Sequence, residues 1–439
     1  MRLKSLTLRN VRLFGNESQT IIFDASKPVT IILGNNGSGK STILDVASIM
    51  LSAFAGSFPG NSEKQFTDAD IHVDDNNTLS DYLSCKAVIS ADTDYEIERY
   101  RRGLSKAPQP QLKSLRTLAE SLLTRLETSD TELPILAYYG TNRTYLQTPA
   151  RRTYSQARYN RWDCYNSALD SATEFKRFFS WFDNKEDEER REKERRKDFS
   201  YIDPVLDTVR QAINRLLSGK YANPRIDIRP LRFDLDELSP DGEPVRTLRL
   251  EQFSDGYKII VAMVADIASR MAEGNPQMAN PLRAKGIVMI DEVDLHLHPQ
   301  WQRSILNDLH GVFPNVQFIV TTHSPLIVLG AAGIAQVVRL QGNRIVDNQM
   351  DISRMDVGQI LLTDLFGLKS VYSPEYDQLF RRHKELLSKY ERLTPDEQTE
   401  LTSLDRKLRQ FSYGQSLEDI RMNKLIQQIA DQLNISQNE

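Results

Sequence analysis

Two apolar runs, each ending in polar side chains that can do chemistry, constrain the fold of this chain more than any other feature. The first, Ile287–Ile290, ends in the adjacent carboxylates Asp291 and Glu292. The second, Val316–Val320, leads into Thr-Thr-His, whose histidine is His323. Short apolar runs of this kind are typical of strands buried on both faces of a sheet. The pattern predicts an α/β fold in which the acid pair and the histidine lie at one edge of that sheet.

A glycine-rich segment near the N-terminus, 34–41 with the sequence GNNGSGKS, lies between a buried strand and a predicted helix over 41–55. This context matches the phosphate-binding loop G-x-x-x-x-G-K-[ST]. Glycines let backbone N–H groups close around phosphates, and the helix start adds the positive end of its dipole. Lys40 is predicted to reach the β- and γ-phosphates of ATP, and the Ser41 hydroxyl to bind Mg²⁺. The predicted nucleotide contacts in this loop are Asn35, Asn36, Gly37, Ser38, Gly39, Lys40, Ser41 and Thr42.

The acid pair and the histidine complete a predicted site for nucleotide hydrolysis. Asp291 is expected to hold Mg²⁺ together with Ser41, through a water molecule. Glu292 comes one residue later, where it can polarise the attacking water. His323 ends the neighbouring strand and is expected to hydrogen-bond the γ-phosphate. The predicted catalytic residues are therefore Glu292 and His323, and the predicted metal ligands are Ser41 and Asp291.

These motifs together resemble the ABC-type ATPases of the SMC, Rad50, RecF and OLD group. The segment DEVDLHLHP followed by TTHSP is specific to the RecF- and OLD-like branch, and the paired strands predicted within 1–23 also fit. The resemblance covers roughly 1–150 and 225–345. It implies an ABC-type P-loop NTPase head with a mixed sheet, a helical insertion and a C-terminal helical segment.

The resemblance also implies two further motifs. One is a signature motif, for which Phe-Ser-Asp-Gly at 253–256 is the candidate; Ser254 and Gly256 would contact the γ-phosphate bound by a second subunit. The other is a loop with a metal-contacting glutamine. Its position corresponds to Tyr139–Arg143, where Asn142 could replace the glutamine.

Composition and periodicity divide the chain into four segments. These are an N-terminal ATPase lobe with the phosphate loop over 1–140, a helical insertion or arm over 141–224, a second ATPase lobe with the signature, acid pair and switch histidine over 225–350, and a helical partner-binding region over 351–439. The run 185–197 consists only of charged residues. It predicts a solvated helix held by opposite charges one turn apart, with a short projecting arm as the alternative. Sheet-like sequence is expected at 225–233 and 245–250, and an amphipathic helical hairpin at 379–390 and 394–411.

The chain carries no recognisable nuclease motif of its own. After Asp294 it has no Asp-x-Asp pair, which TOPRIM nucleases need, and its six histidines form no HNH pattern. This architecture and the segment 356–368 resemble the stand-alone PtuA-type ATPases of Septu antiphage systems, including retron-linked versions. That resemblance implies a homodimer or an oligomer of dimers, and a separate HNH nuclease of the PtuB type as partner. In retron-linked versions a reverse transcriptase with its RNA and DNA is a further partner.

Net charge and cysteine usage limit which ligands and which cellular compartment we expect for the chain. A net charge of −4 gives no overall signature of nucleic-acid binding, so we weigh such contacts only for two basic clusters, at 143–162 and 99–106. Cys85 and Cys164 lie far apart, as expected in a reducing cytosol. No apolar run approaches the roughly 18 residues of a membrane span. We therefore expect a cytoplasmic protein.

The sequence supports one principal functional hypothesis and leaves two alternatives. The principal hypothesis is an ATP-dependent dimeric switch, using ATP and Mg²⁺, that regulates a separate nuclease in antiphage defence. The first alternative is a RecF-like DNA-repair ATPase that acts as a DNA clamp. The second is an OLD-like scaffold whose ATP turnover is slow.

Overall fold

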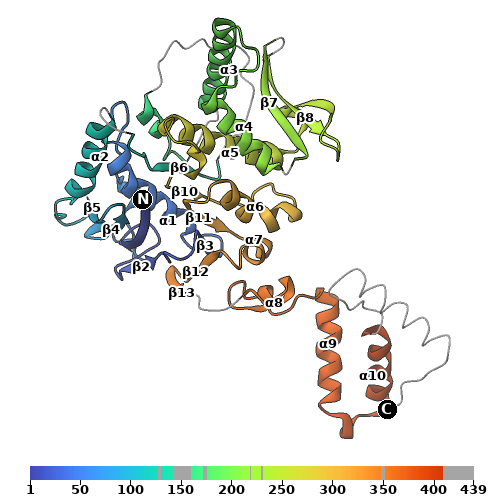
Figure 1. Ribbon diagram of the computed structural model, residues 1–439. Coiled ribbons are helices and arrows are strands. Elements are labelled where there is room, and N and C mark those ends of the chain that lie inside the picture. Colours follow the sequence, from blue (N-terminus) through green and yellow to red (C-terminus); the bar gives the residue numbers. More distant parts are fainter. Residues whose placement is uncertain are drawn as a thin grey trace. The chain divides into compact units, whose positions relative to one another are not determined.

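The computed structural model describes residues 1–126, 130–142, 160–171, 176–217, 219–228, 231–347 and 352–408. The chain divides into two compact units, Met1–Ile360 and Leu361–Glu439 (Figure 1). Four arginines of the basic cluster at 143–162 lie outside the described residues; these are Arg143, Arg151, Arg152 and Arg158.

Six strands of the described residues form the central mixed sheet of the first unit, in the order β13-β12-β3-β11-β10-β6. All neighbours in it are parallel except the edge pair β12 and β13. Every residue of β6, β10 and β11 is buried, as expected for a sheet covered on both faces. The strands are β3 Val29–Gly34, β6 Ile135–Tyr139, β10 Gly286–Ile290, β11 Val316–Thr322, β12 Ala335–Gln341 and β13 Arg344–Asp347.

A second sheet of the first unit is antiparallel, with the order β2-β1-β4-β5. Side chains of β4 alternate strictly between buried and half-buried positions, so one face of this sheet packs on the core. The strands are β1 Arg2–Arg9, β2 Gln19–Ile22, β4 Tyr82–Ser90 and β5 Asp94–Arg102. The pair β1 and β2 confirms the two short strands predicted at the N-terminus.

Helices of the first unit follow the apolar patterns of the sequence. The helix α1 is buried along nearly its whole length, because it follows the phosphate loop into the interior. In Figure 1, α6 and α7 lie beside the strands β10, β11 and β3. The bounds are α1 Lys40–Ala55, α2 Lys113–Leu126, α5 Asp255–Gly274, α6 Pro299–Val312 and α7 Pro325–Gly330. The short helix α8, Val357–Leu362, spans the boundary between the two units. Short 3-10 helices of the first unit span Asp68–Asp70 (η1), Arg161–Tyr165 (η2), Leu250–Gln252 (η3) and Pro281–Arg283 (η4), and one of the second unit spans Tyr390–Arg392 (η5).

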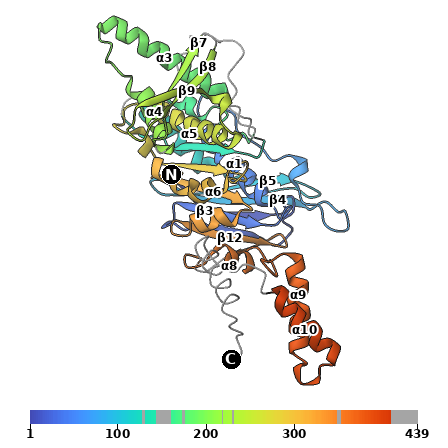
Figure 2. The same ribbon diagram turned by 90° about the vertical axis from the view of Figure 1, so that its right-hand side faces the viewer.

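The predicted insertion contains two helices, α3 Lys176–Arg196 and α4 Pro204–Leu216, followed by a small antiparallel sheet. That sheet has the order β7-β8-β9, with β7 Tyr221–Ile228, β8 Leu231–Leu238 and β9 Pro244–Arg249. Ion pairs one turn apart line α3, including Lys193 with Glu189 and Arg196 with Glu192. The predicted charged helix is therefore confirmed, and Figure 2 shows α3 projecting past α4 and the small sheet.

The described part of the second unit contains a helical hairpin. Its helices, α9 Pro374–Leu387 and α10 Pro395–Leu408, pack through the buried leucines Leu386, Leu401 and Leu404. Thr394 and Glu397 bond each other's backbone N–H groups and so cap the start of α10. The predicted hairpin with its break at Thr394–Pro395 is confirmed. No helix in the described part of the chain combines the length and the apolar composition that crossing a membrane requires.

Candidate nucleotide-binding site

The phosphate loop connects β3 to α1 and depends on two glycines with positive φ. Gly39 caps the start of α1 at φ +97°, and a Cβ atom there would lie 2.8 Å from the ring of Phe14. Gly37 adopts φ +76° and faces open space. Only glycine reaches such backbone angles without strain. Gly39 therefore lets Phe14 pack against the loop, and Gly37 leaves open space beside the loop.

Lys40 lies inside the loop that it is predicted to serve. Its Nζ donates to the carbonyl oxygens of Gly34 and Asn35, at 2.9 and 3.0 Å. Burial lowers the pKa of Lys40, and the charges of Glu292, Asp291 and Asp294 act against that shift. The ammonium group is thus held among acceptors at the place where the motif requires a cation.

A pocket of about 400 Å³ is lined by this loop and by both predicted catalytic side chains. Glu292 and His323 line it together with Leu13 and the loop residues 36–42. The sequence prediction that these groups meet is confirmed as an arrangement in space. Asn35, Asp291, Ser254 and Gly256 are not among the lining residues, although Asn35 binds Lys40 through its carbonyl oxygen.

Strand order explains why these distant segments converge. β11 lies between β3 and β10, and its Val320 pairs with Ile31 on one side and Ile290 on the other. The phosphate loop, the acid pair and His323 therefore leave three neighbouring parallel strands at the same edge. Asp291 is buried at this edge, and its backbone N–H donates to the carbonyl oxygen of Tyr139 on β6, at 2.8 Å.

Thr321 contacts both residues of the acid pair and was not singled out by the sequence. Its hydroxyl oxygen accepts from the backbone N–H of Glu292 at 2.7 Å and donates to Oδ1 of Asp291 at 2.5 Å. Glu292 itself adopts φ +47°, a conformation that costs energy in a residue other than glycine. Thr321 could have been recognised in the sequence, because it is a hydroxyl residue near the end of the apolar run that neighbours the run ending in the acid pair.

His323 is exposed at the pocket, and its pKa is lowered from the ordinary value. Burial is the largest cause, followed by the charge of Lys40; Asp294, Glu292 and Asp291 act in the opposite direction. The imidazole is therefore neutral near pH 7, where one ring nitrogen can donate and the other can accept.

The candidate signature motif starts α5. Ser254 is its exposed N-cap residue, with an extended backbone. Gly256 is buried, and a Cβ atom there would lie 2.5 Å from the carbonyl oxygen of His296. The motif is thus fixed against the segment that follows the acid pair, while Ser254 faces outward.

The candidate site fits a magnesium-bound triphosphate. Ser38 Oγ is buried at the loop, with no hydrogen-bond partner within the described part of the chain. The described residues contain no cluster of three or more His, Cys, Asp or Glu side chains that could hold a metal. Mg²⁺ is commonly held by one or two protein ligands together with the phosphates of the nucleotide. Ser41 and Asp291 are the residues of this edge that would supply such ligands.

Two arginines of the basic clusters at 99–106 and 143–162 have structural roles. Arg99 is buried, where it pairs with Glu63 and donates to the backbone carbonyl of Lys64 at 2.9 Å. Arg161 donates to the backbone carbonyls of Gly274, at 2.8 Å, and Thr131. Both guanidinium groups are turned inward and join distant segments, so of the two interpretations weighed for these residues the structural one holds. The proposed Asn142 is exposed and ends the described stretch.

The chain is similar to several curated proteins. It matches the Retron Vc95 probable ATPase of Vibrio cholerae serotype O1 biovar El Tor with 29% identity over 369 residues, which cover 74% of this chain and 71% of that protein. The Retron Ec83 probable ATPase of Escherichia coli is 28% identical over 393 residues, covering 74% and 69%. The Septu protein PtuA of Bacillus mycoides (strain KBAB4) is 37% identical over 144 residues, covering 32% of this chain and 20% of that protein.

Solved structures similar to this chain include the SMC head domain from Thermotoga maritima. It shares 18% identity and a TM-score of 0.44, over 80% of this chain and 100% of that one. A structure of the SmcHead bound to the C-winged helix domain of ScpA shares 15% identity and a TM-score of 0.47, over 81% and 99%. A family model with the description "AAA domain, putative AbiEii toxin, Type IV TA system" matches residues 29–329.

The fold and the site define an α/β P-loop ATPase with a mixed sheet. The chain belongs to the family described as "AAA domain, putative AbiEii toxin, Type IV TA system". The predicted resemblance to the ATPases of Septu-type and retron-linked antiphage systems is confirmed.

Proposed function

We propose that the chain is an ATP-driven dimeric switch that regulates a separate nuclease in antiphage defence. The observation that carries the proposal is the single pocket shared by the phosphate loop, Glu292 and His323. A cation, a candidate base and a neutral imidazole around one cavity suit the cleavage of a nucleotide triphosphate.

Each predicted residue has a role at this site. Lys40, the loop amides and Thr42 bind the phosphates of ATP, and Ser41 and Asp291 hold Mg²⁺. The metal neutralises charge on the phosphates when it is bound. Glu292 orients the attacking water and takes its proton, while Thr321 fixes the backbone of Glu292.

The position of the signature motif supports a dimer. Ser254 is exposed and does not line the pocket of its own chain, although it starts the long buried helix α5. A second copy can place its Ser254 and Gly256 against a triphosphate held in the first copy. Two such sites per dimer would make closure depend on ATP and opening depend on hydrolysis.

The second unit is the proposed attachment for the nuclease. The hairpin α9–α10 has its own small core, and Tyr372, Phe380 and Tyr390 leave large aromatic surfaces exposed beside it. Aromatic residues are enriched at protein interfaces. The retron and Septu names of the relatives support a role within a defence system that has several components.

The proposal is tested with purified full-length chain and three variants. Glu292→Gln should lower ATP turnover by about 10²- to 10⁴-fold and retain nucleotide binding, because it removes only the base. Lys40→Ala should lose ATP binding. Light scattering of the Glu292→Gln variant with ATP should give a dimer, which Ser254→Arg should disrupt.

The results that would refute this proposal differ for each part. Unchanged turnover in Glu292→Gln would remove the assignment of the base. A dimer unaffected by Ser254→Arg would remove the shared site. The regulatory role requires that an HNH nuclease encoded beside the gene co-purifies with the chain and changes its DNA cleavage with ATP; cleavage independent of this chain would exclude it.

A further inference from the structure

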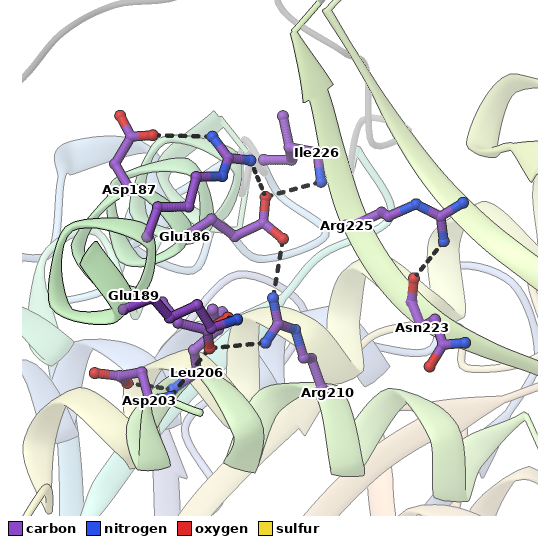
Figure 3. Close-up of polar contacts among 11 residues, drawn as sticks. Glu186, Asp187, Glu189, Asp203, Leu206, Arg210, Asn223, Arg225 and Ile226 are labelled. Carbon is purple, nitrogen blue, oxygen red and sulfur yellow. Dashed lines mark hydrogen bonds and ion pairs between the residues drawn. The ribbon is translucent and has the colours of Figure 1, made fainter. Parts of the chain in front are cut away.

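The projecting helix α3 forms an arm, and a buried cluster of charges between three elements holds the base of this arm. Glu186 and Glu189 of α3 accept hydrogen bonds from Arg210 of α4, at 3.0 and 2.9 Å. Glu186 also accepts from the backbone N–H of Ile226 in β7, at 3.0 Å (Figure 3). Both carboxylates are buried, and satisfied buried networks of this kind fix the elements that they join. The projecting helix α3 is therefore anchored to α4 and to the small sheet.

The loop at the far end of the arm, 197–203, is also fixed. Asp198 accepts from the backbone N–H and the hydroxyl of Ser200, at 2.9 and 2.6 Å. The backbone N–H of Asp203 donates to Glu189 at 3.0 Å, and the Asp203 carboxylate caps α4. The guanidinium of Arg196 lies over the ring of Tyr201, 4.2 Å from its centre. We call residues 190–203, which include this loop, the arm tip.

This ordered tip presents apolar side chains to solvent. Phe199 is 85% exposed and Ile202 is 54% exposed. A large apolar side chain held outward by an ordered loop is a common feature of contact surfaces. The hydrogen bonds of Asp198 and Asp203 set the backbone of the loop, so they also set where Phe199 can point.

Charge along α3 is segregated between the base and the tip. Residues 185–189 contain one basic and four acidic side chains, whereas the arm tip, residues 190–203, contains six basic and four acidic ones. Cations in the last turn of a helix also offset its dipole, which is the structural alternative. That alternative does not account for the exposed Phe199, which lies beyond the end of the helix. A surface with a net positive charge and an exposed aromatic ring is complementary to a polyanion that carries flat bases.

We propose that the arm tip binds single-stranded nucleic acid. Lys197 is exposed and would contact phosphates, as would the exposed Arg195, whose guanidinium also donates to Glu192 at 2.7 Å. Phe199 would stack on a base. Stacking by an exposed ring requires an unpaired base, which favours a single strand over a duplex. The site is separate from the nucleotide pocket and goes beyond the ATP-driven switch, so it stands or fails independently of that function.

The experiment measures binding of the full-length chain to labelled oligothymidylate, oligouridylate and a DNA duplex by fluorescence anisotropy. Phe199→Ala should weaken binding of the single strands by about 5- to 150-fold, and Phe199→Trp should retain it. Lys197→Gln should reduce the slope of log affinity against log salt by about 0.7. Ile22→Ala, at an exposed position of β2, and Lys389→Gln, at an exposed position of the second unit, are the controls and should change neither quantity. Comparison of the two oligonucleotides distinguishes DNA from RNA.

Three results would overturn the proposal. The first is absence of single-strand binding by the unchanged protein, and the second is affinity within twofold in Phe199→Ala. The third is equal loss of duplex and single-strand binding, which would exclude stacking. Light scattering and co-purification with the nuclease run in parallel, and a loss there with unchanged nucleic-acid affinity would assign the tip to a protein partner. Unchanged ATP turnover in Phe199→Ala verifies that the variant is folded.

Discussion

The hydroxyl group of Tyr139 donates to Oδ2 of Asp266 at 2.8 Å inside the core of the first unit. The backbone carbonyl of the same tyrosine accepts from the N–H of Asp291 at 2.8 Å. Asp266 belongs to α5, the helix that starts at Ser254, and also accepts from Arg270 at 2.8 Å. One residue thus joins the candidate metal-binding acid to the candidate signature helix.

Tyr139→Phe should therefore loosen this connection and keep the packing of the ring. Loss of one buried hydrogen bond to a carboxylate costs about 1–3 kcal/mol of unfolding free energy. We expect ATP turnover to fall by about 2- to 30-fold, because the signature helix is no longer tied to the catalytic edge. Tyr138→Phe, which loses a 2.9 Å bond to Asp45 on α1 instead, is the comparison. Equal turnover in Tyr139→Phe and the unchanged protein would contradict the coupling.

Much of this site could be predicted because its signals are local. The phosphate loop is one continuous segment between a strand and a helix, and the acid pair ends an apolar run. Parallel strands then bring such ends together at one edge. Position along the chain was enough to predict that Glu292 and His323 lie beside the phosphate loop, where they line its pocket.

The features that the sequence did not reveal depend on partners far along the chain. Arg99 belongs to a basic cluster in sequence, yet it pairs with Glu63 across 36 positions and becomes buried. Arg161 bonds Gly274 across 113 positions. Periodicity reports which face of an element is apolar and does not identify the element that it meets. For the same reason the sheet-like segment 225–233 could not be divided into parts of β7 and β8, which pair with each other.

Thr321→Val should impair catalysis more than stability. The substitution removes the acceptor for the Glu292 N–H and the donor to Asp291, so the backbone of Glu292 and the carboxylate of Asp291 lose their common support. Substitutions of residues that support metal ligands typically lower activity by about 10- to 100-fold. The measurements are turnover and its dependence on Mg²⁺ concentration. Thr30→Val, at a buried threonine of β3 away from the edge, is the control. An equal loss in both variants would show a general packing effect.

Gly39→Ala should destabilise the protein more than Gly37→Ala. Both glycines have positive φ, so alanine at either position costs about 1–2 kcal/mol. Only at Gly39 does the added Cβ meet the Phe14 ring, at 2.8 Å, which adds a packing cost of about 1–3 kcal/mol. Urea unfolding of both variants measures the difference. Phe14→Leu in the Gly39→Ala background should recover the packing part, and equal stabilities of the two alanine variants would refute the contact.

Burial raises the pKa of Glu273 from 4.5 to about 6, and the nearby Arg177 and Arg270 partly oppose this shift. A carboxyl group with a raised native pKa binds protons more tightly in the folded state than in the unfolded state. Its contribution to stability is therefore fully present below about pH 4.5 and is lost as the pH rises through 6. A shift of this size corresponds to about 2 kcal/mol.

Glu273→Gln removes this titration and leaves an amide that can still accept from Arg177. The unfolding free energy of the variant minus that of the unchanged protein should rise by about 2 kcal/mol between about pH 4.5 and about pH 7. Urea unfolding at several pH values measures this difference. Glu192→Gln is the control, because hydrogen bonds from Arg195 and Arg196 lower the pKa of Glu192 and its difference should change in the opposite direction. If the difference for Glu273→Gln stays constant with pH, the pKa of the buried carboxyl group is not raised.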